Sequence, residues 1–242
     1  RLPLANQGRA SGSSGHPRNH KMVRSESSGN PRSLTLLKEF IMNWYLQGLA
    51  SATEEALHLV DNAVALGDDS NFSCPLPIPQ EVRANLVVLL IEYISFDGAH
   101  HFGQLVVHKG IERAVKEIFE ILLFLRFPIA NMAPISSYGW NDEASMAANN
   151  TSAFNYRNIG GGDRERLSWH AYGLAIDINP LFNPWVKDGM VAPSGAFYQP
   201  LRPGTITANS DIVALFRAYG FEWGGAWETP KDYQHFQFPY QF

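Results

Sequence analysis

Apolar residues recur at helical spacing along several stretches of the chain. Between residues 33 and 66 they follow one face of a helix, and an interruption near Gly48 divides this stretch into two predicted helices. A third helix is predicted at 110–127, where the apolar positions share one face and the pattern ends before a proline. The stretch 210–221 repeats the helical pattern. It starts with Ser-Asp, which can cap a helix, and closes with a glycine that can end one. On the predicted helix 110–127, the apolar face consists of Val115, Ile118, Phe119, Leu122 and Leu123.

Runs of branched apolar residues predict strands between these helices. The sequence "ANLVVLLIEYISF" at 84–96 and the sequence "GQLVVHK" at 103–109 have the composition of buried strands. Helices and strands therefore alternate irregularly, which is typical of an α+β fold. We expect a central antiparallel sheet with flanking helices.

Composition divides the chain into three parts. Residues 1–32 are rich in Ser, Gly, Asn, Pro and Arg and have no periodic apolar face, which indicates a flexible leader. Residues 33–80 form a predicted accessory helical segment, which ends in a stretch of turn formers and prolines. Residues 81–242 are predicted to form the main domain.

Charge, hydropathy and cysteine content argue against several kinds of surface and site. The formal net charge is −4, and the 19 Lys and Arg residues are not gathered into one block, so neither a nucleic-acid surface nor a polybasic membrane surface is predicted. The apolar runs are interrupted by charged residues and are shorter than the roughly 20 residues that a membrane span needs. Cys74 is the only cysteine, which excludes an intramolecular disulfide and a cysteine-rich zinc site.

The stretch "SWHAYGLAIDINP" at 168–180 places a histidine and an aspartate around a glycine turn. Read as a strand, its second half puts Leu174, Ile176 and Ile178 on a core face, and it puts Ala175 and Asp177 on the other. The small residues leave space beside the Asp177 carboxylate, and the turn can bring His170 over that space. Taken alone, this pair is more often a structural hydrogen bond than a ligand pair.

A third candidate ligand lies near the C-terminus, in "KDYQHFQF". His235 and Gln237 share one strand face there, while the two phenylalanines point to the core. Two neutral imidazoles and one carboxylate suit zinc, and they leave a fourth position for water, as in catalytic sites. Asp232, three residues before His235, is a candidate acceptor for the proton of that water.

These motifs resemble those of a known family. "SWHAYGLAIDINP" is similar to the S-x-H-x-x-G-x-A-x-D motif of the zinc peptidases of bacterial cell walls, and "DYQHFQF" resembles the second motif of that family. The family includes VanY-like D-alanyl-D-alanine carboxypeptidases and the L-alanyl-D-glutamate endopeptidases of phage endolysins. The resemblance covers roughly residues 97–242 and implies the hedgehog/DD-peptidase fold. It implies that His170, Asp177 and His235 bind Zn²⁺ and that Asp232 is the general base. Arg157, in "SAFNYR", stands where related enzymes have an arginine near the scissile carbonyl.

The resemblance also implies the substrate class, which is the stem peptide of peptidoglycan. The carboxypeptidase branch usually has Glu-x-x-His in the second motif, whereas "DYQH" has Asp-x-x-His, as in the endolysin branch. This difference favours an L-alanyl-D-glutamate endopeptidase over a D-alanyl-D-alanine carboxypeptidase. We expect the protein to be exported to the bacterial cell wall or periplasm, or to be released with a phage lysis system.

Two functions of other classes also fit two histidines and one carboxylate or the same fold. A non-haem iron oxygenase also uses two histidines and one carboxylate, but its first two ligands are usually separated by one residue, and here six intervene. A non-catalytic wall-binding domain on the same fold is the other alternative, although the presence of Asp232 disfavours it. The histidines in "GAHHFGQLVVHKG" are expected at exposed turn and strand positions, and Ser145 lacks the context of a nucleophile.

Overall fold

A computed structural model describes residues 77–159 and 166–240, all of which belong to one compact unit of the chain. The predicted leader at 1–32, the two predicted helices at 33–66 and Cys74 lie outside the described residues. The division of the chain at residue 80 therefore stays a prediction. Near it, the structure has a single helical turn, α3 (Gln80–Arg83).

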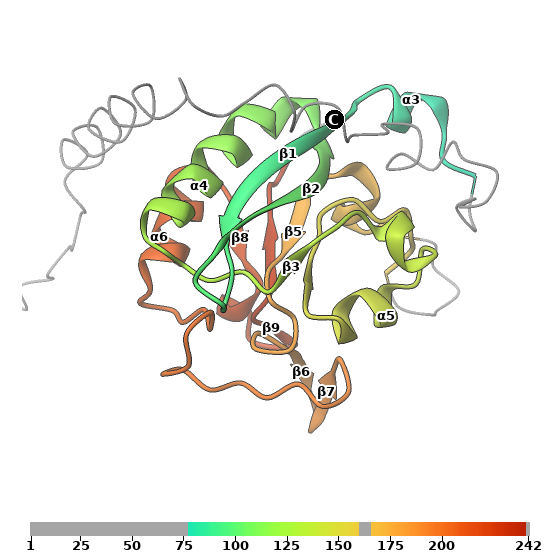
Figure 1. Cartoon of the computed structure of the whole chain (residues 1–242). Helices are drawn as coiled ribbons and strands as arrows, with labels where there is room; N and C mark the ends of the chain where they lie inside the picture. The colour runs from blue at the N-terminus through green and yellow to red at the C-terminus, as the bar shows by residue number, and fades with distance from the viewer. Residues whose placement is uncertain (1–76, 160–165, 241–242) are drawn as a thin grey trace, which may run out of the picture. The chain divides into compact units, whose positions relative to one another are not determined.

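A long antiparallel hairpin forms the first part of the fold (Figure 1). It consists of β1 (Leu86–Ile94) and β2 (His100–His108), as predicted from the two apolar runs. The strands pair from Leu86 opposite His108 to Ile94 opposite His100. The turn between them contains Gly98 at a φ of 77°, a left-handed conformation that glycine adopts without strain.

Both predicted helices of the described part are present. Helix α4 (Glu112–Phe124) packs on β1 and buries Val115, Ile118, Phe119 and Leu122, whereas the predicted face residue Leu123 is only half-buried. Helix α6 (Asp211–Ala218) is capped by Ser210, whose Oγ accepts from the amide of Val213 at 3.5 Å. It is followed by Gly220 at a φ of 89°.

Short strands form three further sheets in the described residues. One antiparallel sheet has the order β5 (Ala175–Asp177), β10 (His235–Gln237) and β8 (Glu222–Trp223). Another has the order β7 (Met190–Ala192), β6 (Trp185–Lys187) and β9 (Lys231–Asp232). A parallel pair joins β3 (Asn131–Met132) to β4 (Asn150–Thr151). The remaining elements are helix α5 (Asp142–Ala147) and four 3₁₀ turns, η3 (Lys109–Ile111), η4 (Ile135–Tyr138), η5 (Trp169–Tyr172) and η6 (Gly224–Ala226).

The predicted α+β class is confirmed, with one difference in the sheet and one in β5. The antiparallel strands are divided among three small sheets in the described part, where we expected one central sheet. The side chain of Ala175, predicted beside open space, is fully buried. The reason is that β5 is an interior strand, paired with β10 on one edge and bridged to Ser152 on the other. All three residues of β5 are buried, so side chains on both of its faces are covered.

Part of the hydrophobic core lies between helix α6 and the β5-β10-β8 sheet. Phe216 of α6 stacks on Phe236 of β10, with ring centroids 3.9 Å apart, and both side chains are fully buried.

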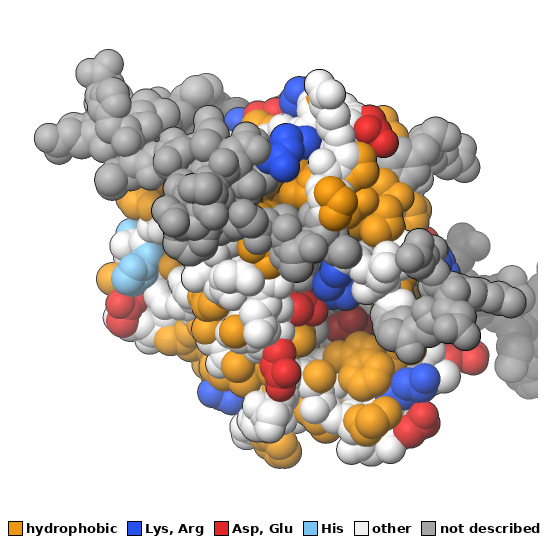
Figure 2. Space-filling model, turned by 90° about the vertical axis from the view of Figure 1, so that its right-hand side faces the viewer, with side chains coloured by type: hydrophobic (Ala, Val, Ile, Leu, Met, Phe, Trp, Pro, Cys, Tyr) orange, Lys and Arg blue, Asp and Glu red, His pale blue; other side chains and the backbone are white. Residues whose placement is uncertain are grey.

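On the face of the molecule in Figure 2, acidic, basic and hydrophobic side chains are interspersed. Among the described residues, no helix has the length and hydropathy to cross a membrane.

Candidate metal centre

His170 is positioned by a tight turn that the sequence specifies locally. Its amide donates to the Ser168 Oγ at 3.3 Å, which caps the 3₁₀ turn η5, and Gly173 at a φ of 67° turns the chain back into β5. The ring Nδ1 donates to the backbone carbonyl of Ala153 through a short hydrogen bond. Because this bond holds the proton on Nδ1, the lone pair of a neutral ring is on Nε2. His170 is therefore both buried and oriented.

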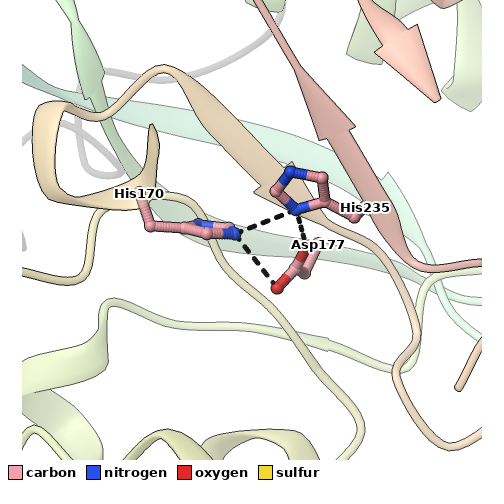
Figure 3. A group of neighbouring side chains, drawn as sticks. All are labelled: His170, Asp177 and His235. Carbon is pink, nitrogen blue, oxygen red and sulfur yellow. Dashed lines mark hydrogen bonds and ion pairs between the residues drawn. The ribbon is translucent and has the colours of Figure 1, made fainter. Parts of the chain in front are cut away.

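Asp177 and His235 are brought together by strand register. They lie directly opposite each other in the β5-β10 pair, and His235 Nδ1 is 2.9 Å from Asp177 Oδ1. His170 Nε2 points at the same place from η5, 3.2 Å from Asp177 Oδ2 and 3.2 Å from His235 Nδ1 (Figure 3). All three side chains are buried.

The geometry of this group fits a small cation. The candidate ligand atoms of His170, Asp177 and His235 lie within 4.8 Å of one another. Zinc bonds of about 2.0 to 2.2 Å to nitrogen and oxygen would place neighbouring ligand atoms roughly 3.3 to 3.6 Å apart in a tetrahedral site. The separations of 2.9 and 3.2 Å are slightly shorter, so a modest expansion would accommodate the ion. A buried carboxylate beside two imidazoles is the donor set expected for zinc.

The electrostatics of the group reflect strong mutual interaction. Burial would raise the pKa of the Asp177 carboxyl, but the His170 and His235 rings outweigh it and hold that pKa well below its usual range. Burial would lower the pKa of His235, but the hydrogen bond and charge of Asp177 outweigh it, so this pKa is raised. Protonation of His235 would place a positive charge beside the Asp177 carboxylate.

Asp232 lies next to this group, at the end of β9. The chain passes from one sheet to the other between Asp232 and His235, because β9 and β10 belong to different sheets. Burial raises the pKa of Asp232 to about 6. The charge of Asp177 also raises this pKa, whereas the charges of His235 and His170 lower it. Its Oδ1 is buried without a hydrogen-bond partner. An unpaired carboxylate oxygen at this position can accept a proton from a bound water.

Two glycines, which the motifs do not include, allow this approach. A Cβ on Gly224 would lie 2.7 Å from the backbone oxygen of Asp232 and 3.3 Å from the Cβ of His235, and a Cβ on Gly225 would meet the ring of Trp223 at 2.2 Å. Only glycine fits this close packing. The pattern "WGGAW" at 223–227, a few residues before the second motif, is the sequence feature from which this packing could have been inferred.

Arg157 is not part of the buried group. Its Nε lies 3.2 Å from Asp142 Oδ2 of α5, and the side chain is 34% exposed. Nε is buried and makes no hydrogen bond, so the contact is an ion pair without good hydrogen-bond geometry. The Arg157 carbonyl accepts from the amide of Ser168 at 3.1 Å, which ties its backbone to the turn that carries His170.

The three hairpin histidines and Ser145 have structural contacts. His100 and His101 are paired with Glu92 and Asp97 at the exposed end of the hairpin. His108 Nδ1 accepts from the Gly110 amide and caps η3. The Oγ of Ser145 is buried and accepts from Asn150 at 2.9 Å. These contacts account for each of them without a catalytic role.

Part of the chain is similar in sequence to known proteins. Residues 161–238 match the sequence profile of a family described as D-alanyl-D-alanine carboxypeptidase. Over 73 residues the chain is 37% identical to the peptidoglycan L-alanyl-D-glutamate endopeptidase CwlK of Bacillus subtilis. That alignment covers 29% of this chain and 38% of the relative. No solved structure matches the chain significantly.

The resemblance predicted from the two motifs is thus confirmed, over a segment shorter than the predicted 97–242. The matched segment contains His170, Asp177, Asp232 and His235, whereas Arg157 precedes it.

Proposed function

We propose that this chain, which resembles the D-alanyl-D-alanine carboxypeptidase family over residues 161–238, is a zinc metallopeptidase acting on the stem peptides of peptidoglycan. The observation that carries the proposal is the convergence of His170, Asp177 and His235 on one buried point. Three protein ligands would leave a fourth position for water, which is the arrangement of a catalytic zinc site.

The roles of the side chains follow from this arrangement. When bound, zinc supplies Lewis acidity, which polarises a peptide carbonyl and makes water acidic near neutral pH. His170, Asp177 and His235 hold the metal. Asp232 accepts the proton of the attacking water and returns it to the leaving amine. Burial favours this task, because it raises the pKa of the Asp232 carboxyl above that of an ordinary aspartate and so makes the carboxylate a stronger base.

Arg157 is proposed to stabilise the negative charge that develops on the scissile carbonyl. The Nε makes no hydrogen bond and the side chain is partly exposed, so the guanidinium is able to exchange its ion pair with Asp142 for a substrate contact. Preorganised donors of this kind contribute most when charge forms in the transition state.

An L-alanyl-D-glutamate endopeptidase is the favoured specificity. The second motif has Asp at the base position, and CwlK, which is described as a peptidoglycan L-alanyl-D-glutamate endopeptidase, is similar over the matched segment. A D-alanyl-D-alanine carboxypeptidase is the alternative, in line with the description of the matched family. Either activity places the protein in the bacterial cell wall or periplasm, or in a phage lysis system.

Digestion of purified peptidoglycan tests the activity and its specificity together. Mass spectrometry of the products would find new amino-terminal D-glutamate after endopeptidase action, and free D-alanine after carboxypeptidase action. Neither product would appear if the domain only binds the wall. Metal analysis of the purified protein separates zinc from the iron that an oxygenase would hold.

Two variants separate metal binding from proton transfer. His170→Ala should lose both zinc and hydrolysis, because it removes a ligand. Asp232→Asn should keep zinc while turnover falls by about 10² to 10⁴, the usual contribution of a positioned general base. If Asp232→Asn loses zinc together with activity, Asp232 is a ligand; if it stays fully active, another group is the base.

A further inference from the structure

A chain of side-chain hydrogen bonds leads from His235 to the surface. His235 Nε2 lies 3.2 Å from Gln237 Oε1, and Gln237 Nε2 donates to Glu222 Oε2 at 3.0 Å. Gln237 and Glu222 are opposite each other in the β10-β8 pair, so the backbone register holds them together. Neither residue touches the proposed metal position, and no role follows for them from the two motifs.

The identity of each donor follows from the outermost residue. An ionised carboxylate only accepts hydrogen bonds, so the Gln237 side chain must turn its NH₂ group toward Glu222 and its oxygen toward His235. That oxygen accepts as well, so His235 Nε2 must carry a proton. In a neutral ring the lone pair is then on Nδ1, the atom that faces Asp177 and His170.

Asp177 favours the opposite protonation of the same ring. Its Oδ1 is 2.9 Å from His235 Nδ1 and can accept a proton from it. A proton on Nδ1 would occupy the lone pair that a metal needs. The two neighbours of His235 therefore compete, and the Gln237 oxygen is the group that favours the metal-binding form. For His170 the corresponding partner is the Ala153 backbone carbonyl, which no substitution removes.

We propose that Gln237, oriented by Glu222, is a positioning residue that holds His235 in its metal-binding tautomer and thereby sets the zinc affinity of the site. This inference rests on the proposed zinc function and adds two residues to it. Partners of this kind, one step removed from the metal, typically change metal affinity by about 10- to 100-fold.

Zinc affinity, measured at one fixed pH by competition with a chromophoric chelator, tests the proposal. Gln237→Met keeps the length of the side chain but removes the acceptor, and it should weaken zinc binding by about 10- to 100-fold. The exchanged pair, Glu222→Gln with Gln237→Glu, retains an acceptor beside His235 and should restore most of the affinity. Gln104→Met makes the same change on β2, away from the site, and should leave affinity unchanged.

A second measurement reads the tautomer directly and needs no metal. Long-range proton-nitrogen NMR of the metal-free protein, at a pH above the raised pKa of His235 so that the ring is neutral, should find the His235 proton on Nε2 in the wild type, and a shift of population toward Nδ1 in Gln237→Met. A purely structural role for Gln237 would change stability without moving this proton.

The outcomes separate this inference from the proposed function. A wild-type protein that binds no zinc would overturn the proposed function itself. Zinc bound by the wild type and by Gln237→Met with equal affinity, with the same His235 tautomer in both, would overturn the inference alone. If Gln237→Met does not fold, the exchanged pair decides, because a loss of affinity there contradicts the role assigned to the acceptor.

Discussion

Gly173→Ala is a single substitution that tests how the first motif holds the metal centre. Gly173 lies in the left-handed region, with a φ of 67° and a ψ of 26°, at the end of the turn that carries His170. A residue with a Cβ costs about 1 to 2 kcal/mol there. The added Cβ would also lie 2.7 Å from the His108 amide nitrogen and 2.9 Å from the Leu86 Cδ2.

The overlap lowers the stability of the folded state because the neighbouring atoms are held in place. The His108 amide donates to the Gly173 carbonyl at 2.9 Å, so a movement that relieves the overlap also strains this hydrogen bond. Overpacking of this kind costs about 1 to 3 kcal/mol. The two effects together predict a loss of about 2 to 5 kcal/mol in the free energy of unfolding.

Gly98→Ala is the matched control, because it isolates the first effect. Gly98 has a φ of 77°, but an added Cβ would have no atom within 4 Å, so only the backbone cost applies. Denaturant unfolding of both variants at the same zinc concentration should give the larger loss for Gly173→Ala, together with weaker zinc binding caused by displacement of His170. Equal losses in the two variants would refute the packing argument.

Two further predictions concern the chemistry of the site. Arg157→Ala should lower peptidoglycan hydrolysis by roughly 10²-fold or more while zinc content stays unchanged, if the guanidinium stabilises the oxyanion; unchanged kinetics would leave Arg157 with its ion pair to Asp142 alone. The raised pKa of His235 predicts opposite pH trends with and without metal. In the metal-free protein, the stability from protonated His235 is fully present below about pH 6.5 and is lost as pH rises through the raised folded-state pKa. Zinc affinity should rise over the same window, because binding displaces the proton. Zinc affinity that does not change with pH across this window would contradict the prediction that zinc displaces a proton from His235.

Local patterns in the sequence determined the four longest elements of the described part. The apolar spacing predicted β1, β2, α4 and α6, because each of these elements packs one regular face and follows its own periodicity. The candidate metal residues were also readable, since Gly173 makes a local turn between His170 and β5, and His235 lies on a short strand with an apolar face. These features depend on neighbours within a few residues along the chain.

Tertiary structure alone decided the contacts between segments far apart in the sequence. The approach of Gly224 to Asp232 and the pairing of Gln237 with Glu222 depend on which strands become neighbours and in which register. The same holds for the ion pair of Arg157 with Asp142. The burial of Ala175 differed from its alternating pattern for this reason, because a strand's own sequence does not reveal whether its second face will be covered. The periodicity of a segment indicates only which of its own faces is buried. The proposed position of the proton on His235 depends instead on side chains from three paired strands, β5, β10 and β8.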